Sequence, residues 1–85
     1  MPTLYTTIGT QEKIEPKNKE FFTLSEIKKL VGGYFEIIKR TDDNKFIIGN
    51  EKGRIKMLPL NVLASSIFKV KLYGNIVICD VTFFD

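Results

Sequence analysis

The clearest hydrophobic pattern in the chain is helical and covers residues 24–31. Leu24, Ile27, Leu30 and Val31 recur at helical spacing on one face, and charged residues stand between them. This spacing predicts an amphipathic helix whose apolar side packs on a core.

The residues at both ends of this stretch are those that favour helix termini. Thr23 suits the N-cap position, and Glu26 three positions later completes a capping box with it. Phe22 and Ile27 have the spacing of a hydrophobic staple. Gly32 follows the last apolar residue, where a left-handed conformation carries no Cβ penalty. We therefore expect the helix to run from about residue 24 to residue 31.

A strand meander is predicted to follow this helix. Residues 34–40 and 45–49 are rich in β-branched and aromatic side chains, and residues 54–58 alternate between charged and apolar types. The segments between them, 41–44 and 50–53, contain the short polar residues and glycine that favour turns. The pattern therefore predicts three consecutive antiparallel strands.

Three further expectations concern this meander. Gly53 is expected to have a positive φ, in a type I turn that is followed by a bulge. Phe35, Ile37 and Lys39 share one face of the first strand, and this face is the better candidate to point toward the core. Pro59 ends the third strand because it has no N–H to donate to a neighbour.

The two ends of the chain carry weaker patterns. Residues 2–9 alternate weakly and are predicted to form a short edge strand, and the charged residues 10–20 are interpreted as a solvated loop. Asn61 is a candidate cap for a short second helix over residues 62–68. Residues 76–84 are β-branched and aromatic and have one wholly apolar face, which favours a central strand.

Together these elements predict an α+β fold, with a mainly antiparallel sheet of four or five strands and one well-capped helix on one face. The 85 residues suffice for one core, so residues 1–85 are interpreted as a single domain, with residues 1–22 as a weakly ordered edge strand and loop. A core of this size supplies only about 3–5 kcal/mol of net stability. The sequence therefore leaves open a homodimer that buries a sheet edge or an apolar patch.

The charge of the chain argues against a nucleic-acid partner. Thirteen basic residues are set against ten acidic ones, which gives a net charge of +3. Only Arg40 and Arg54 are arginines, the residue that nucleic-acid readers use for bidentate contacts. The first residues lack the pattern of a signal peptide, and no apolar run approaches the roughly 20 residues that cross a bilayer. These features favour a cytoplasmic protein that does not bind membranes.

The residue types exclude several kinds of chemistry. The chain has no histidine, and its single cysteine, Cys79, lies in an apolar run where a buried inert thiol is expected. One cysteine permits neither an internal disulfide nor a Cys/His zinc site. Glu36 is a candidate general base, but a solvent-facing carboxylate paired with a lysine such as Lys56 is the favoured interpretation.

Two other motifs also have plain structural interpretations. Asp42, Asp43 and Asp80 offer carboxylates for a hard cation, but an acidic turn is favoured, because such sites need carboxylates that converge from different elements. Gly32 and Gly33 follow a helix and precede a strand, which is the reverse of a phosphate loop. The sequence therefore predicts no catalytic residue, no cofactor and no metal site, and we do not expect an enzyme.

One polar and cationic group remains as a candidate binding surface. If the turn at residues 50–53 lies near the corner at residues 58–61, their polar atoms and cations can receive an acidic protein patch or a small anionic ligand such as a nucleotide. Solvated hairpin charges are the plain alternative. The candidate binding residues are Asn50, Lys52, Arg54, Lys56 and Asn61.

Four motifs in order resemble those of a family of small uncharacterised proteins encoded by bacteriophages, large viruses and bacteria. Members of this family share four motifs: a helix that ends in V-G-G-Y-[IF]-E, a strand pair around N-E-[EDK]-G-[KR], an L-P-x-N corner and a late strand that begins G-[DN]-I-[VI]. The resemblance covers about residues 23–79, and the family more often has Asp where Asn75 stands. It implies no activity and no catalytic residue. The matching segments here are residues 30–36, 49–56, 58–61 and 74–77.

These observations lead to two functional hypotheses. The leading one is a non-enzymatic binding module, an accessory protein of a phage or mobile element that engages a host or viral protein in the host cytoplasm. The alternative is a protein that binds a small anionic, nucleotide-like ligand through residues 50–61.

Overall fold

The computed structural model describes residues 2–80 and contains one five-stranded antiparallel sheet, with the strand order β2-β1-β5-β4-β3. The predicted α+β fold, with four or five strands and a second short helix, is confirmed. In chain order the elements are β1 (Thr3–Tyr5), β2 (Gln11–Lys13), α1 (Leu24–Val31), β3 (Phe35–Arg40), β4 (Lys45–Asn50), α2 (Val62–Phe68) and β5 (Ile76–Asp80).

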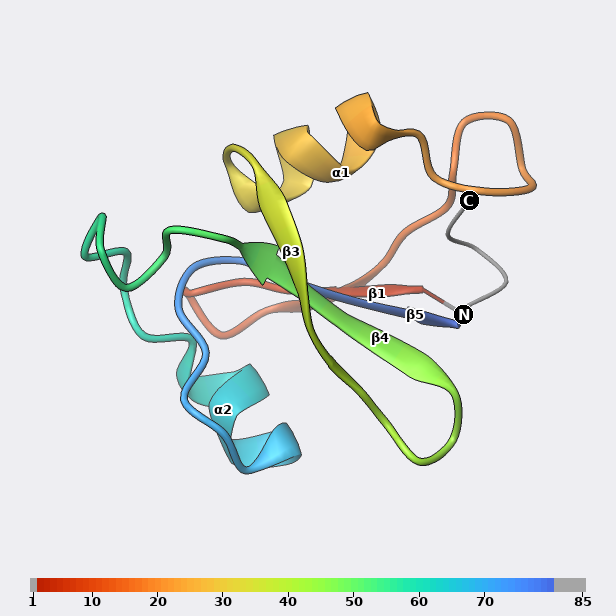
Figure 1. Ribbon diagram of the computed structural model, residues 1–85. Coiled ribbons are helices and arrows are strands. Elements are labelled where there is room, and N and C mark those ends of the chain that lie inside the picture. The colour runs from red at the N-terminus through yellow and green to blue at the C-terminus, as the bar shows by residue number, and fades with distance from the viewer. Residues whose placement is uncertain (1, 81–85) are drawn as a thin grey trace.

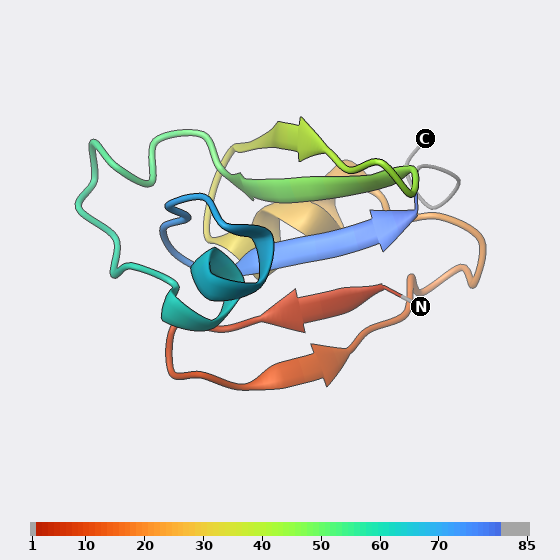
Figure 2. The same cartoon turned by 90° about the horizontal axis from the view of Figure 1, so that it is seen from below.

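The sheet lies between the two helices, with α1 on one face and α2 on the other (Figures 1 and 2). Successive residues of the central strands face these two helices in turn. Ile48 and Val77 belong to the apolar cluster that includes α1 residues, whereas Ile47 and Ile78 belong to the cluster that includes Ala64 of α2. Strands β4 and β5 are therefore buried on both sides, which explains their nearly continuous apolar sequence.

Strand β5 lies in the centre of the sheet. It pairs with β1 on one side and with β4 on the other. The prediction of a central strand is confirmed for residues 76–80, and the remainder of the predicted strand, residues 81–84, lies outside the described residues.

Both predicted ends of α1 are confirmed. The Thr23 hydroxyl oxygen accepts a hydrogen bond from the Glu26 N–H at 3.2 Å, and the Glu26 carboxylate accepts one from the Thr23 N–H at 3.0 Å. The Lys17 N–H donates to the same carboxylate at 2.9 Å. These backbone donors hold the pKa of Glu26 below its usual value, and the Thr23 N–H has the largest effect. At the other end Gly32 has φ of 81°, the left-handed conformation expected there.

The N-terminal strands differ from the prediction. β1 is not at an edge, because it lies between β5 and β2, and β2 falls within the residues predicted to be a loop. All residues of β2 are polar and exposed, so it has no apolar pattern that could have revealed a strand. The hydrogen bonds between its backbone and that of β1 are what define it as a strand. Because β1 is its single neighbour, β2 forms the edge of the sheet.

The predicted strand at residues 54–58 is wrong. Residues 51–57 instead form consecutive turns, in which the N–H of Lys56 donates to the carbonyl oxygen of Lys52 at 2.8 Å. Met57 has φ of 55°, which a strand does not allow, whereas Gly53 does not have the positive φ that was predicted. The second neighbour of β4 is therefore β5 and not a third strand of a meander.

The predicted core face of β3 is also wrong in part, because the strand contains a bulge. Ile37 lies opposite Ile48, but Lys39 lies opposite Ile47, so Ile38 is an extra residue in the ladder. Since Ile47 and Ile48 point to opposite faces of the sheet, Lys39 faces the α2 side and not the side of Ile37. Phe35 packs against the cluster under α1, as expected, but Ile37 is 43% exposed.

Candidate binding site

The candidate residues 50–56 lie at the end of β4 and in the loop of residues 51–57, which we call the 51–57 loop. The loop projects from one end of the sheet, beyond both helices (Figure 1). The Glu51 N–H donates to the carbonyl oxygen of Tyr34 at 3.0 Å, and the Leu58 N–H donates to that of Gly53 at 2.9 Å. These bonds give the loop a defined conformation.

Asn50 is buried and has a structural role at the start of this loop. Its side-chain N–H donates to the carbonyl oxygen of Val31, the last residue of α1, at 3.3 Å. Its side-chain oxygen accepts from the Lys52 N–H at 2.9 Å. Asn50 therefore joins the loop to the C-terminal end of α1.

Asn61 is fully buried, and the structure does not bring it to the surface with the cations. Its side-chain N–H groups donate to the carbonyl oxygens of Tyr5 at 2.8 Å and Gly74 at 2.9 Å. Its side-chain oxygen accepts from the Ala64 N–H at 3.0 Å, which confirms the predicted cap of α2. Three hydrogen bonds within the chain thus occupy this amide.

The three cationic candidates, Lys52, Arg54 and Lys56, are exposed. They stand among the two apolar side chains, Ile55 and Met57, of the segment that was predicted to be a strand. Ile55 is 80% exposed and Met57 is 87% exposed. Charged and apolar residues alternate over residues 54–58, as in a strand with one buried face. Because this segment lies in a projecting loop, both kinds of side chain are exposed to solvent.

Two hollows lie at the base of the loop and share Arg54 and Tyr73. The guanidinium of Arg54 lies 5.9 Å from the centre of the Tyr73 ring. One hollow, of about 380 Å³, is lined by these two residues with Met57 and Leu58. The other, of about 310 Å³, extends from the loop to β3 and to the segment before β5. Its lining includes Ile38, Ile55 and Lys71, together with the carboxylates of Glu36 and Glu51.

Glu36 is exposed on β3, so the prediction that it faces solvent is confirmed. The expected pairing with Lys56 is wrong, because Lys56 is not on a strand and Gly49 lies opposite Glu36. The residue lines a hollow, but it has no histidine or cysteine beside it there. Glu36 is therefore a surface carboxylate without a histidine or cysteine partner for proton transfer in this hollow.

The acidic turn after β3 is a local structure. The Thr41 hydroxyl donates to the Asp43 carboxylate, which holds the pKa of that carboxyl below its usual value, and Lys45 lies 3.5 Å away from it. Within residues 2–80, no three histidine, cysteine or acidic side chains converge in a way that would hold a metal ion.

Cys79 is buried in the core, as predicted. Burial raises the pKa of its thiol to about 11, and the nearby charge of Asp80 acts in the same direction. The thiol is therefore protonated near neutral pH and is not a nucleophile in the native protein.

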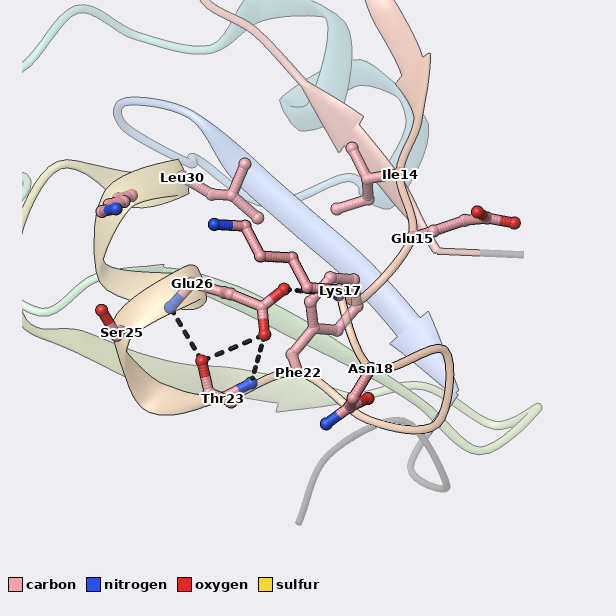
Figure 3. A pocket seen from close by; sticks show the side chains of 10 residues that line it. Ile14, Glu15, Lys17, Asn18, Phe22, Thr23, Ser25, Glu26 and Leu30 are labelled. Atoms are coloured by element: carbon pink, nitrogen blue, oxygen red, sulfur yellow. Dashed lines mark hydrogen bonds between the residues drawn. The ribbon is translucent and has the colours of Figure 1, made fainter.

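A third hollow, which we call the α1 groove, was not anticipated from the sequence. It lies between α1 and residues 14–18, and its volume is about 450 Å³ (Figure 3). Ile14 gave the one hint of it, as an aliphatic residue within an otherwise charged segment. The residues that line the groove include Ile14, Lys17, Phe22, Glu26, Lys29 and Leu30.

Neither described helix has the length and hydrophobicity that a bilayer-spanning segment requires. No curated protein and no solved structure matches the chain. A family model described as a domain of unknown function, DUF3846, matches residues 7–82, a longer stretch than the one over which the motifs were noticed. This chain therefore belongs to the DUF3846 family.

Proposed function

We propose that this protein is a non-enzymatic protein-binding module and that the 51–57 loop is its contact surface. One observation carries the proposal. Ile55 and Met57 are exposed by 80% and 87% in a loop whose backbone hydrogen bonds hold its conformation. Single exposed apolar residues are ordinary, but here two of them project together from one end of the sheet.

Burial of these side chains against a partner would supply most of the binding energy. Removing an isoleucine or methionine side chain from water contributes roughly 1.5–3 kcal/mol. The loop is already ordered by its turns, so binding costs little additional conformational entropy. Met57 and Tyr73 also border a hollow that can receive an apolar side chain of the partner.

The charges around the loop indicate the chemistry of this partner. Lys52, Arg54 and Lys56 are exposed beside the two apolar residues, and Glu51 is the single acidic residue of the loop. Complementary charge steers association and disfavours wrong partners. The partner we propose is therefore a protein that has an apolar cleft with acidic residues at its rim.

The biological setting of the proposal comes from the four sequence motifs. They resemble those of proteins from bacteriophages, large viruses and bacteria. We propose an accessory protein of a phage or mobile element, which acts in the host cytoplasm on a host or viral protein.

Cross-linking in a lysate of the natural host, followed by mass spectrometry, tests this proposal. The Ile55→Asp/Met57→Asp variant should lose the cross-linked partner. Ile8→Asp is the matched control, because Ile8 is 84% exposed in the turn between β1 and β2 and should tolerate the change. A partner captured equally by wild type and both variants would remove the loop from the proposal. Turnover of any substrate that depends on Glu36 would contradict a non-enzymatic role.

A small anionic ligand remains the second candidate, and the hollow of about 310 Å³ favours it. Arg54, Lys71 and the Tyr73 ring line this hollow and could hold the phosphate and the base of a nucleotide. Native mass spectrometry distinguishes the two candidates. An added mass of a few hundred daltons that disappears on charge reversal of Arg54 and Lys71 supports the ligand, whereas a protein adduct or a homodimer supports the module.

A further inference from the structure

Residues 14–18, which form one side of the α1 groove, lie at the opposite end of the molecule from the 51–57 loop in both views of the fold (Figures 1 and 2). Its volume of about 450 Å³ is within the range of small-molecule sites. Nothing in the proposed protein-binding role uses it.

The floor of the groove is apolar. Phe22 is 5% exposed and belongs to the core cluster under α1, and Ile14 and Leu30 pack against that cluster from the two sides of the groove. A hydrocarbon chain placed here would contact aliphatic and aromatic carbon and would cover the edge of the core. The groove therefore favours a ligand with an extended apolar part.

The two acidic residues of the groove are Glu15 and Glu26, and their carboxylates are directed away from its apolar floor. The Glu26 carboxylate accepts hydrogen bonds from the Thr23 N–H, the Thr23 hydroxyl and the Lys17 N–H, so it is turned to the helix cap. Glu15 lines the groove but its carboxylate points away from Phe22 and Leu30 (Figure 3).

Two lysine residues line the groove, one from each of its sides. The side chain of Lys17 extends from the loop toward α1, past Phe22 (Figure 3). Lys29 is an exposed residue of α1 itself. Glu26 is engaged in the cap and Glu15 is directed outward, so Lys17 and Lys29 are the charged residues of the lining that can donate hydrogen bonds to a ligand head group.

We propose that the α1 groove binds an amphipathic anion, namely an aliphatic carboxylate whose chain lies on Ile14, Phe22 and Leu30. Its carboxylate is held by Lys17 and Lys29. Affinity depends on the length of the chain because the floor is apolar, and on the sign of the head group because Lys17 and Lys29 line the groove.

Titration with sodium decanoate below its micelle concentration, followed by ¹H–¹⁵N NMR, tests this site. Shifts are expected in α1 and residues 14–22, and affinity should rise roughly twofold to fourfold for each methylene from hexanoate to decanoate. Decyltrimethylammonium has the opposite charge and an alkyl tail one carbon longer, and it should still bind at least about tenfold more weakly.

A charge swap makes the test specific. Lys17→Glu/Lys29→Glu should weaken decanoate by about tenfold and reverse the preference toward decyltrimethylammonium. Lys39→Glu/Lys69→Glu changes the net charge equally outside the groove and should leave both affinities unchanged. The proposal is overturned if decanoate does not shift residues of the groove, if both head groups bind equally, or if the two double variants behave alike. These results leave the role of the 51–57 loop untouched, because its residues are not involved.

Discussion

The side chain of Asn61 donates a hydrogen bond of 2.8 Å to the carbonyl oxygen of Tyr5, a residue 56 positions earlier in the chain. The same amide donates to Gly74 and accepts from Ala64. One buried side chain therefore joins the end of β1, the turn before β5 and the first turn of α2. Since this side chain is fully buried, solvent does not compete for these bonds in the native protein.

Asn61→Ala is expected to lower the free energy of unfolding by about 2–4 kcal/mol, because it removes a helix cap and leaves buried carbonyl groups without donors. Urea denaturation measures the change. Asn18→Ala is the control, since the exposed Asn18 side chain accepts only from the nearby N–H groups of Glu20 and Phe21 and should cost less than about 1 kcal/mol. Equal losses in the two variants would contradict the structural role of Asn61.

The capping carboxylate of Glu26 makes stability depend on pH. Its pKa is lowered in the folded protein, so its contribution is present above its usual pKa of 4.5 and is lost as the pH falls through the folded value. Glu26→Gln should therefore be less stable than wild type at neutral pH, and the difference should shrink in acid below about pH 4.5. Thermal unfolding over a pH series measures this, with Glu20→Gln, which caps no helix, as the control. A difference that does not change with pH would contradict the prediction.

Both ends of α1 could be predicted from the sequence because they depend on local interactions. The capping box of Thr23 and Glu26 and the left-handed Gly32 depend on residues within one turn, so the sequence contains all the information needed to place both ends of the helix. Strand β5 was also predictable, because it is apolar on both faces and a strand of that kind must be central.

The missed features depend on contacts between distant residues. Strand β2 is polar throughout, and only its pairing with β1 defines it. Asn50 and Asn61 were assigned to a binding surface because they lie in a predicted turn and a predicted corner that could meet. Their burial follows from hydrogen bonds to residues 19 and 56 positions away, which no local pattern reveals. The cations of the 51–57 loop were identified from the sequence as candidate binding residues, but the loop itself and the exposure of Ile55 and Met57 were not predicted.

The thiol of Cys79 should be almost unreactive in the native protein. Its pKa of about 11 leaves roughly two orders of magnitude less thiolate at pH 8 than an ordinary cysteine has. The raised pKa also links this thiol to stability. The stability that the buried, protonated thiol supports is fully present below the usual cysteine pKa of 9.0 and is lost as the pH rises toward about 11. Reaction with Ellman's reagent at pH 8 should be slow until guanidinium chloride unfolds the chain. Rapid labelling without denaturant would show that the thiol is accessible.

The bulge in β3 and Gly49 of β4 are expected to depend on each other. A Cβ atom at Gly49 would lie 2.8 Å from Cδ1 of Ile38, the extra residue of the bulge, and 2.9 Å from Cδ1 of Ile76. Gly49→Ala should therefore cost about 1–3 kcal/mol of stability through overpacking. Ile38 is 37% exposed and can move, whereas Ile76 is completely buried, so the contact with Ile76 should account for more of this cost.

A double-mutant cycle separates these two contacts. Ile38→Val and Ile76→Val each delete the Cδ1 atom that the new methyl group would meet. Combined with Gly49→Ala, each should cost less than the sum of the two single changes, and the coupling should be larger with Ile76. Additive costs in both cycles, measured by urea denaturation, would mean that the sheet accepts a side chain at position 49 by shifting its backbone. In that case the β3 bulge would not be the reason that position 49 requires glycine.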